Sequence, residues 1–251
     1  MNRIAAIVPA YNEEKAITAV VNDILEIAQS QNLSITVIVV NDCSLDSTSE
    51  IISKLKCVAL NLPVNLGIGG AVQTGFKYAF ENGFDYAIQI DGDGQHPASE
   101  IPKLINAAKE NKLDVVIGSR YVKGGSLDKN WPLWRKFLSG FGNNYARTIL
   151  RFPLHDVTTG FRMWKREALS KMPLDRIRSS GYIFLVEMAY VAYLMGYDIV
   201  EVPIHFEDRR FGKSKMSLKI QLEAAIRIWD VRWHYSDMRS KSRPHEIKIE
   251  E

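Results

Sequence analysis

The first 120 residues alternate between strand-like and helix-like segments, and this rhythm constrains the fold more than any other feature of the sequence. The strand-like segments are short and apolar, whereas the segments between them carry apolar residues at helical spacing. Such an alternation predicts a mostly parallel sheet with helices on both faces. The expected strands are Ile4–Val8, Ser34–Val40, Val58–Leu60, Tyr86–Ile90 and Val115–Ile117. The expected helices between them are Glu13–Gln29, Ser47–Leu55, Gly69–Asn82 and Ala98–Glu110.

After Ser119 the alternation becomes irregular, although further strand-like and helix-like segments follow. The expected helices there are Trp131–Leu150, Tyr182–Met195 and the amphipathic segment Leu218–Trp233. The expected strands are Phe161–Lys165 and Ile199–Ile204. No shift in composition marks a domain boundary, so we expect a single domain over residues 1–236 with halves 1–120 and 121–236. The polar segment 237–251 is expected to be a flexible tail.

Charge is unevenly distributed along the chain. The 32 basic and 29 acidic residues give a net charge of +3, but Arg209–Arg243 alone carries ten basic and three acidic residues, which leaves the rest mildly acidic. The hydrophobic content of 46% is typical of a globular protein and excludes a disordered or collagen-like chain. We expect neither a transmembrane helix nor a signal peptide, because their sequence patterns are not found. Two cysteines make no disulfide framework or metal cluster, which favours a reducing cytosolic setting.

Two acidic residues follow the fourth expected strand. Asp91 and Asp93 are separated by one glycine and stand at the carboxyl end of this strand, where ligands bind in open α/β sheets. From these positions they can turn towards a common point, and Gln95 adds a carbonyl oxygen. Hard oxygen ligands suit Mg²⁺ or Mn²⁺, which are held by one or two carboxylates together with substrate phosphates. The alternative is a surface turn, because Asp-Gly is frequent in turns.

Polar residues also follow the first two expected strands. Tyr11 is able to stack on a nucleobase, and Asp42 is able to hold a base or a ribose hydroxyl. Glu14 is more simply explained by the dipole of the helix that follows. A glycine-rich loop lies at Asn65–Gly70, but Val72 stands where a dinucleotide fingerprint has its third glycine, which disfavours an oxidoreductase. The glycines of this loop are expected to allow close approach to a ligand or to form a turn.

Taken in order, these motifs resemble those of the family 2 glycosyltransferases of the GT-A fold, and more narrowly those of the dolichyl- and polyprenyl-phosphate mannose synthases. The resemblance covers about Ile4 to Leu218. The motifs shared with the wider family are Val8–Glu14, Asn41-Asp42 and Asp91–Asp93. The more specific motifs are Gly118–Val122 with Gly124-Gly125, Trp131–Arg135, Asp156, Thr158–Arg162, Ser180–Tyr182, Glu187-Met188, Glu201–Ile204, Asp208-Arg209 and Gly212–Met216. The resemblance implies a mostly parallel nucleotide-binding sheet flanked by helices, with a nucleotide-sugar half at 1–120 and an acceptor half at 121–236.

The resemblance also implies roles for individual residues. The nucleotide-sugar site would comprise Pro9, Ala10, Tyr11, Glu13, Val40, Asp42, Asp91, Gly92, Asp93, Arg209 and Lys215. A divalent metal, Mn²⁺ or Mg²⁺, would be held by Asp91, Asp93 and Gln95. The acceptor phosphate would be bound by Arg120, Arg135 and Ser139. The residues implied in catalysis are Asp93, Arg120, Arg135 and Arg209, the last on a mobile loop with Lys213 and Lys215.

The implied activity is transfer of a sugar, with mannose from GDP-mannose favoured, to a polyprenyl or dolichyl phosphate. A phosphate acceptor is already ionised near neutral pH, so one in-line displacement with inversion needs no strong general base. A hydroxyl acceptor on a glycan would need a base, for which acids near Asp156 or Glu187 are candidates. The segment Asp91–His96 also resembles relatives that use UDP-glucose or UDP-N-acetylglucosamine, and these donors remain alternatives.

Two other classes of protein agree less well with the sequence. A nucleotidyltransferase would carry a basic, glycine-rich loop directly after the first strand, and a nucleic-acid binder would gain nothing from Asp91 and Asp93. The helix Leu218–Trp233 has two interpretations: it packs on the sheet, or it lies at a membrane surface with tryptophan at headgroup depth. We expect a peripheral enzyme at the cytoplasmic face of a membrane, without a nucleic-acid partner. A small membrane-anchoring partner is a further option.

Overall fold

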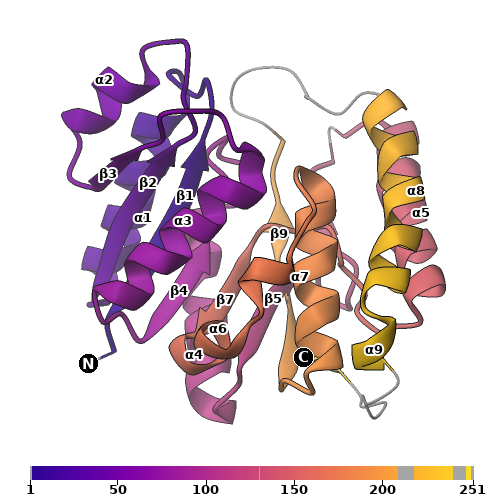
Figure 1. The fold of residues 1–251 in the computed structure, drawn as a ribbon. Helices are drawn as coiled ribbons and strands as arrows, with labels where there is room; N and C mark the ends of the chain where they lie inside the picture. Colours follow the sequence, from indigo (N-terminus) through magenta and orange to yellow (C-terminus); the bar gives the residue numbers. More distant parts are fainter. Residues whose placement is uncertain (1, 130, 209–217, 240–246, 250–251) are drawn as a thin grey trace.

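A computed structural model describes residues 2–129, 131–208, 218–239 and 247–249. Within these residues, the centre of the molecule is an eight-stranded sheet with the order β10-β8-β5-β7-β4-β1-β2-β3 (Figure 1). Its strands are β1 Ile4–Ala10, β2 Ile35–Asn41, β3 Val58–Asn61, β4 Tyr86–Gln89, β5 Val115–Ser119, β7 Arg162–Lys165, β8 Ile199–Pro203 and β10 Lys248–Ile249. A small parallel sheet joins β6 (Ser126–Leu127) to β9 (His205–Phe206).

Helices cover both faces of the large sheet, and each face has its own apolar core. The helices are α1 Ile17–Ser30, α2 Thr48–Ser53, α3 Gly67–Glu81, α4 Ile101–Asn111, α5 Leu133–Leu150, α6 Arg166–Lys171, α7 Tyr182–Leu194, α8 Leu218–His234 and α9 Ser236–Arg239. Side chains alternate along each strand, so Ile7 enters the core shared with α3 and α7, while Ile4 and Val8 enter the core shared with α1 and α4.

The parallel sheet predicted from the first 120 residues is confirmed. β1 pairs in parallel with both β2 and β4, and β2 pairs in parallel with β3. β7 departs from this pattern, because it runs antiparallel between β4 and β5 and thereby joins the two parts of the sheet. The helix α6 and the strands β6 and β9 were not predicted.

The carboxyl ends of β1, β2, β4 and β5 meet at one edge of the sheet, as the sequence predicted for the first, second and fourth of its strands. The register pairs Ala10 with Asn41, and the backbone N–H of Asp42 donates to the Ala10 carbonyl oxygen at 2.8 Å. β4 ends two residues before Asp91, and β5 ends directly before Arg120. Four strand ends therefore supply polar side chains to one edge.

Helix α8 packs mainly against α5 and α7, which contradicts the interpretation that it packs on the sheet (Figure 1). Ile228 and Val231 form its buried side, whereas Trp229 and Trp233 are exposed. The described residues of the polar segment 237–251 include most of α9 and the strand β10, which pairs in parallel with β8.

Candidate functional site

The first part of the site lies where β1 and β2 end. Asp42 is buried, and its Oδ1 accepts a hydrogen bond from the backbone N–H of Leu66 at 2.7 Å. The side-chain amide of Asn65 donates to the backbone carbonyl oxygen of Asp42 at 3.1 Å. These bonds hold the loop before α3 against the end of β2. The half-buried Tyr11 follows β1 at the same edge.

The other predicted donor-site residues are distributed differently. Pro9 and Ala10 are the last residues of β1. Glu13 is tied to the start of α2, because its backbone N–H donates to Thr48 Oγ1 at 2.9 Å. Val40 is fully buried, and its side chain packs in the apolar core between the sheet and the helices α3 and α7 rather than lining a pocket. Outside the described residues lie Arg209, Lys213 and Lys215.

The turn after β4 contains the predicted metal ligands Asp91, Asp93 and Gln95. Asp93 and Gln95 are buried, and the Gln95 backbone N–H donates to Asp93 Oδ1 at 3.1 Å. Two glycines leave room for this turn. A Cβ at Gly160 would lie 2.6 Å from Asp91 Oδ1, and a Cβ at Gly92 would lie 2.8 Å from a β1 carbonyl oxygen. Any larger residue at either position would displace the turn.

The chemistry of these ligands fits a hard divalent cation. Among the described residues, no three or more His, Cys, Asp or Glu side chains gather in a metal-binding group. The predicted set has two carboxylates and one amide oxygen, a set that Mg²⁺ and Mn²⁺ complete with phosphate oxygens and water. The Gln95 Nε2 donates to the Glu207 carbonyl oxygen at 3.3 Å, and this bond orients the side-chain amide.

His96 packs behind the turn that follows β4 and stabilises it. Its fully buried ring stacks on Phe161 with ring centres 5.2 Å apart and meets Phe206 edge-on at 5.0 Å. Burial lowers the pKa of His96 to about 4, although the charge of Asp93 acts in the opposite direction. The imidazole is therefore neutral at pH 7, and its Nδ1 accepts the backbone N–H of Asp91 at 3.4 Å.

Arg120 forms a buried ion pair with Asp156 directly after β5. The Arg120 Nε donates to Oδ2 at 2.7 Å and Nη2 donates to Oδ1 at 2.7 Å, a bidentate arrangement. Nη2 also donates to Thr158 Oγ1 at 2.8 Å. Burial raises the pKa of Asp156, but the charge and hydrogen bonds of Arg120 outweigh it and hold this pKa below its usual range. Burial lowers the pKa of Arg120, and Asp156 outweighs it in turn, so both groups are charged at neutral pH.

The two acids considered as general bases are both engaged by the protein. Asp156 is fully buried against Arg120. Glu187 is also buried, and it accepts the backbone N–H groups of residues 178 and 179 at 3.3 and 2.9 Å and the Tyr235 hydroxyl at 2.8 Å. Glu187 thus fixes the loop before α7 to the end of α8.

The predicted acceptor residues come together at α5. Arg135 and Ser139 are one turn apart on this helix, and the Tyr121 hydroxyl donates to Ser139 Oγ at 2.7 Å. The Arg120 guanidinium lies 5.4 Å from the centre of the Tyr121 ring. Tyr121 therefore links the cation after β5 to the hydroxyl on α5.

Arg135 is fixed by two contacts and remains 24% exposed. Its guanidinium lies over the Trp131 ring at 4.0 Å, and its Nη1 donates to Asp208 Oδ1 at 3.4 Å. When a guanidinium stacks on an aromatic ring, its N–H groups remain able to form two parallel hydrogen bonds to an anion. Asp208 supplies the anion in this structure.

Several residues of the site were missed by sequence reasoning, namely Tyr121, Gly160, Glu201 and Asp208. Glu201 accepts the backbone N–H groups of His155 and Asp156 at 2.8 and 2.9 Å and so holds the loop that presents Asp156. All four occur within the motifs quoted above, but a motif does not say which side chains meet across the sheet edge.

Of the two purposes expected of the glycine-rich loop, the structure agrees with a turn. Gly67 has φ of +73°, which agrees with a turn. A Cβ at Gly69, however, would lie 3.0 Å from the Phe184 ring and 3.2 Å from the Ser179 carbonyl oxygen. This glycine makes room for α7 and its preceding loop.

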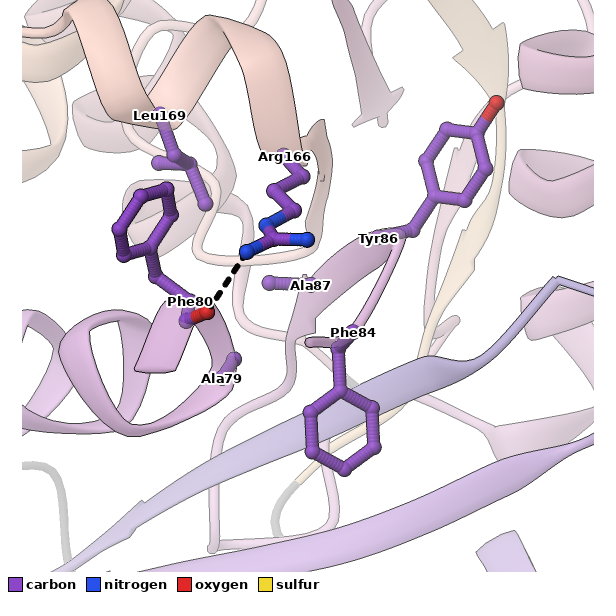
Figure 2. A pocket seen from close by; sticks show the side chains of 7 residues that line it. All are labelled: Ala79, Phe80, Phe84, Tyr86, Ala87, Arg166 and Leu169. Atoms are coloured by element: carbon purple, nitrogen blue, oxygen red, sulfur yellow. Dashed lines mark hydrogen bonds between the residues drawn. The ribbon is translucent and has the colours of Figure 1, made fainter. Parts of the chain in front are cut away.

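A small apolar cavity lies at the opposite end of the sheet (Figure 2). Tyr86 at the start of β4 and Phe80 near the end of α3 are among its lining residues. Arg166 covers it, with its guanidinium 4.9 Å from the Phe80 ring centre and a hydrogen bond of 3.2 Å to the Phe80 carbonyl oxygen. This cavity brings together none of the predicted site residues.

In the part of the chain that the structure describes, no helix has the length and apolar character needed to cross a membrane.

Comparisons with known proteins agree with the resemblance. The model of the family described as glycosyl transferase family 2 matches residues 5–172. An undecaprenyl-phosphate mannosyltransferase from Micrococcus luteus is 34% identical over 246 residues, which cover 95% of this chain and 98% of that protein. A polyprenol monophosphomannose synthase from Mycolicibacterium smegmatis is 33% identical over 238 residues, covering 92% and 88%.

Solved structures confirm the predicted GT-A fold. Glucosyl-3-phosphoglycerate synthase from Mycobacterium tuberculosis, in complex with Mn²⁺, UDP and phosphoglyceric acid, has a TM-score of 0.69 and 15% identity, covering 99% of this chain and 88% of that one. Its UDP complex has a TM-score of 0.67 and 16% identity, covering 95% and 80%.

Proposed function

Because the chain belongs to glycosyltransferase family 2, we propose that it transfers mannose from GDP-mannose to a polyprenyl phosphate, with inversion at the anomeric carbon. The observation that carries the proposal is the contact group of Arg120, Tyr121 and Ser139 beside Arg135. Arginine binds phosphate oxygens in pairs, so the partly exposed Arg135 beside the Ser139 hydroxyl supports a phosphate monoester as the acceptor, while Arg120, whose fork is engaged by Asp156, adds positive charge nearby. Two relatives at 33–34% identity carry names of polyprenyl-phosphate mannose transfer, which supports the same acceptor and sugar.

In this proposal, residues 1–120 bind the donor and residues 121–236 bind the acceptor, within one domain. Tyr11 and Asp42 hold the nucleoside beside Pro9 and Ala10, and Arg209 and Lys215 neutralise the donor phosphates. The hydrogen bonds between Asp42 and the loop before α3 support this, because they hold that loop in place beside the proposed nucleoside site.

We assign Mn²⁺ or Mg²⁺ to the oxygens of Asp91, Asp93 and Gln95. When bound, such a cation supplies charge neutralisation to the departing nucleoside diphosphate. The space that Gly160 leaves for Asp91 supports the assignment. A solved neighbour of the same fold has been crystallised with Mn²⁺ and UDP.

The remaining chemistry falls to positioning by the chain's own residues. Arg135 and Ser139 orient the attacking phosphate oxygen, and Arg120 adds positive potential beside them. No general base is required, because the acceptor phosphate has a second pKa of about 6. The engagement of both Asp156 and Glu187 in buried hydrogen bonds supports this account.

A polyprenyl phosphate is a membrane lipid, so the proposed reaction takes place at a bilayer surface. We propose that the protein acts there as a peripheral enzyme on the cytoplasmic face, where nucleotide sugars are present, and that a small membrane protein is able to assist its anchoring.

A donor-selection assay tests the function. Purified protein is incubated with Mn²⁺ or Mg²⁺, a short polyprenyl phosphate and, separately, labelled GDP-mannose, UDP-glucose or UDP-N-acetylglucosamine. We expect labelled lipid from GDP-mannose, and its loss in Asp93→Ala but not in the matched surface control Glu26→Ala on α1. Product from a UDP donor alone would refute the donor, activity in Asp93→Ala would refute the metal site, and no lipid product from any donor would refute the function.

A further inference from the structure

A continuous row of aromatic rings crosses the outer surface of α5 and α8. Phe137, Phe141 and Tyr145 recur every four residues on α5, and successive ring centres lie 6.4 and 6.3 Å apart with nearly parallel planes. Trp229 on α8 continues the row, because its indole N–H donates to the Tyr145 hydroxyl at 3.0 Å. Trp233 follows one turn further along α8. The aromatic face is defined here as Leu133, Trp134, Phe137, Phe141, Tyr145, Ile226, Trp229 and Trp233.

The aromatic face gathers most of the exposed large hydrophobic side chains of the described residues. Of twelve strongly exposed large hydrophobic side chains among the described residues, seven belong to it, and Phe137 and Trp233 are 75% and 69% exposed. The other five, including Leu45, are spread over other elements. Single exposed apolar residues are ordinary, but a contiguous patch marks a surface that binds a partner or a membrane.

Helix α5 carries apolar side chains on its outer side as well as on its buried side. Its buried residues are Ala146, Leu150 and Asn143, whose Oδ1 accepts the Val157 backbone N–H at 2.9 Å, while its phenylalanines face outward. Phe141 lies two residues from Asn143, which places the two side chains on opposite sides of an α-helix. A surface helix in water normally carries polar residues on its outer side. The solvent facing α5 in the working protein is therefore apolar.

Charge identifies which apolar partner fits. Within α5 the only charged residues are Arg135, Lys136 and Arg147, and the helix carries no acid. Cations beside Trp and Phe are the composition of helices that lie in the interface of anionic lipid, with aromatic rings at headgroup depth. On α8, Lys219, Arg227 and Arg232 outnumber Glu223 and Asp230, so the two helices together carry six basic and two acidic residues. This net positive charge favours an anionic lipid surface over a protein partner of ordinary composition.

We propose that the aromatic face of α5 and α8 docks on an anionic lipid bilayer, with both helix axes in the plane of the membrane. The two helices run in parallel, because Tyr145 bonds to Ala225 and Arg232 bonds to Ile149 further along both. Docking in this orientation places Arg135, next to Trp134, at the level of lipid phosphates. The inference rests on the proposed function in one respect, that the acceptor is itself a lipid phosphate.

Vesicle flotation tests the docking surface directly. The probe is vesicles of phosphatidylcholine with phosphatidylglycerol, and the variant is Phe137→Ser/Phe141→Ser. We expect the unaltered protein to float and the variant to lose roughly tenfold or more of its partitioning, since two inserted aromatic rings are removed. Leu45→Ser, which alters a side chain that is 84% exposed outside the face, is the matched control and floats as the unaltered protein does.

Three outcomes would overturn the proposal. The first is that the unaltered protein does not float with anionic vesicles. The second is that Phe137→Ser/Phe141→Ser floats equally well. The third is a dimer, measured by light scattering, that the variant dissociates without any change in flotation, because the face would then join two copies of the chain. Both substituted side chains are exposed, so urea denaturation should show that the variant keeps its fold.

An acceptor comparison separates this inference from the proposed function. The same variant is assayed with a short, water-soluble polyprenyl phosphate and with a long one embedded in vesicles. We expect roughly tenfold slower transfer to the embedded acceptor and unchanged transfer to the soluble one. Equal rates with the embedded acceptor would overturn the docking surface. Failure of the unaltered protein with both acceptors would instead reject the proposed function, and the flotation result would stand by itself.

Discussion

The ion pair of Arg120 and Asp156 provides the sharpest test of a reaction without a general base. Asp156→Asn keeps the size of the side chain but removes its charge. One carboxylate oxygen is replaced by an N–H group that faces an Arg120 donor, where the natural contacts are 2.7 Å long. The Arg120 backbone N–H, which donates to Oδ2 at 3.0 Å, is left to compete for the remaining oxygen.

The expected cost follows from the burial of both groups. Removing one partner of a buried, hydrogen-bonded ion pair leaves an uncompensated charge and costs about 3–5 kcal/mol. Asp156 is fully buried and Arg120 is 8% exposed, so solvent screens little of this. We therefore expect the free energy of unfolding to fall by about 3–5 kcal/mol in urea denaturation. Replacing both partners, as Arg120→Met/Asp156→Leu, should recover most of that loss.

The activity of Asp156→Asn distinguishes a positioning carboxylate from a base. If Asp156 positions Arg120, the KM for the acceptor phosphate rises while kcat, measured below the unfolding transition, falls by less than about tenfold. A general base contributes about 100-fold to 10,000-fold to the rate. A fall in kcat of that size, with unchanged stability and unchanged acceptor KM, would refute the base-free account.

Three further predictions follow from individual contacts. Gly160→Ala places a Cβ 2.6 Å from Asp91 Oδ1, so it should raise the Mn²⁺ concentration needed for half-maximal activity several-fold, while unaltered metal dependence would show that Asp91 lies outside the metal site. Asp208→Asn removes the anion that competes for Arg135 and should lower the acceptor KM; a higher KM would show that Asp208 positions Arg135 instead. Burial raises the pKa of Tyr197 to about 12, so its contribution to stability is complete below pH 10 and is lost as the pH rises towards 12, by about 2–3 kcal/mol in total. Tyr197→Phe should flatten this part of the stability profile in alkaline urea titrations, and an unchanged profile would contradict the assignment.

The sequence was most informative where a feature depends on local pattern. The strands β1 to β5 and the helices between them were predicted from local pattern, because a buried parallel strand leaves a short apolar run and an amphipathic helix leaves apolar residues at helical spacing. Strand β7 was predicted as a strand, but its antiparallel place between β4 and β5 was not, since pairing is decided by packing across the sheet. The short elements α6, β6 and β9 were not predicted.

The candidate site shows the same division. Asp91, Asp93 and Asp42 were identified from their positions after strands. Contacts between distant parts of the chain were not predicted. They are the packing of Gly160 against Asp91, the bond of Asp208 to Arg135 and the bond of Glu201 to the Asp156 backbone. Glu187 was a candidate base by its chemistry alone, and only the fold shows it held by Tyr235 and two backbone N–H groups.

The sequence by itself determined the parallel sheet, the acidic edge and the resemblance to a glycosyltransferase family, because these depend on residue types at fixed spacing. Tertiary structure decided which groups are available to a substrate. It committed Asp156 to Arg120 and left Arg135 partly exposed, since burial makes an unpaired charge costly and forces each buried carboxylate to find donors. It also turned the phenylalanines of α5 outward, because which side of a helix meets the core depends on its neighbours and not on the helix alone.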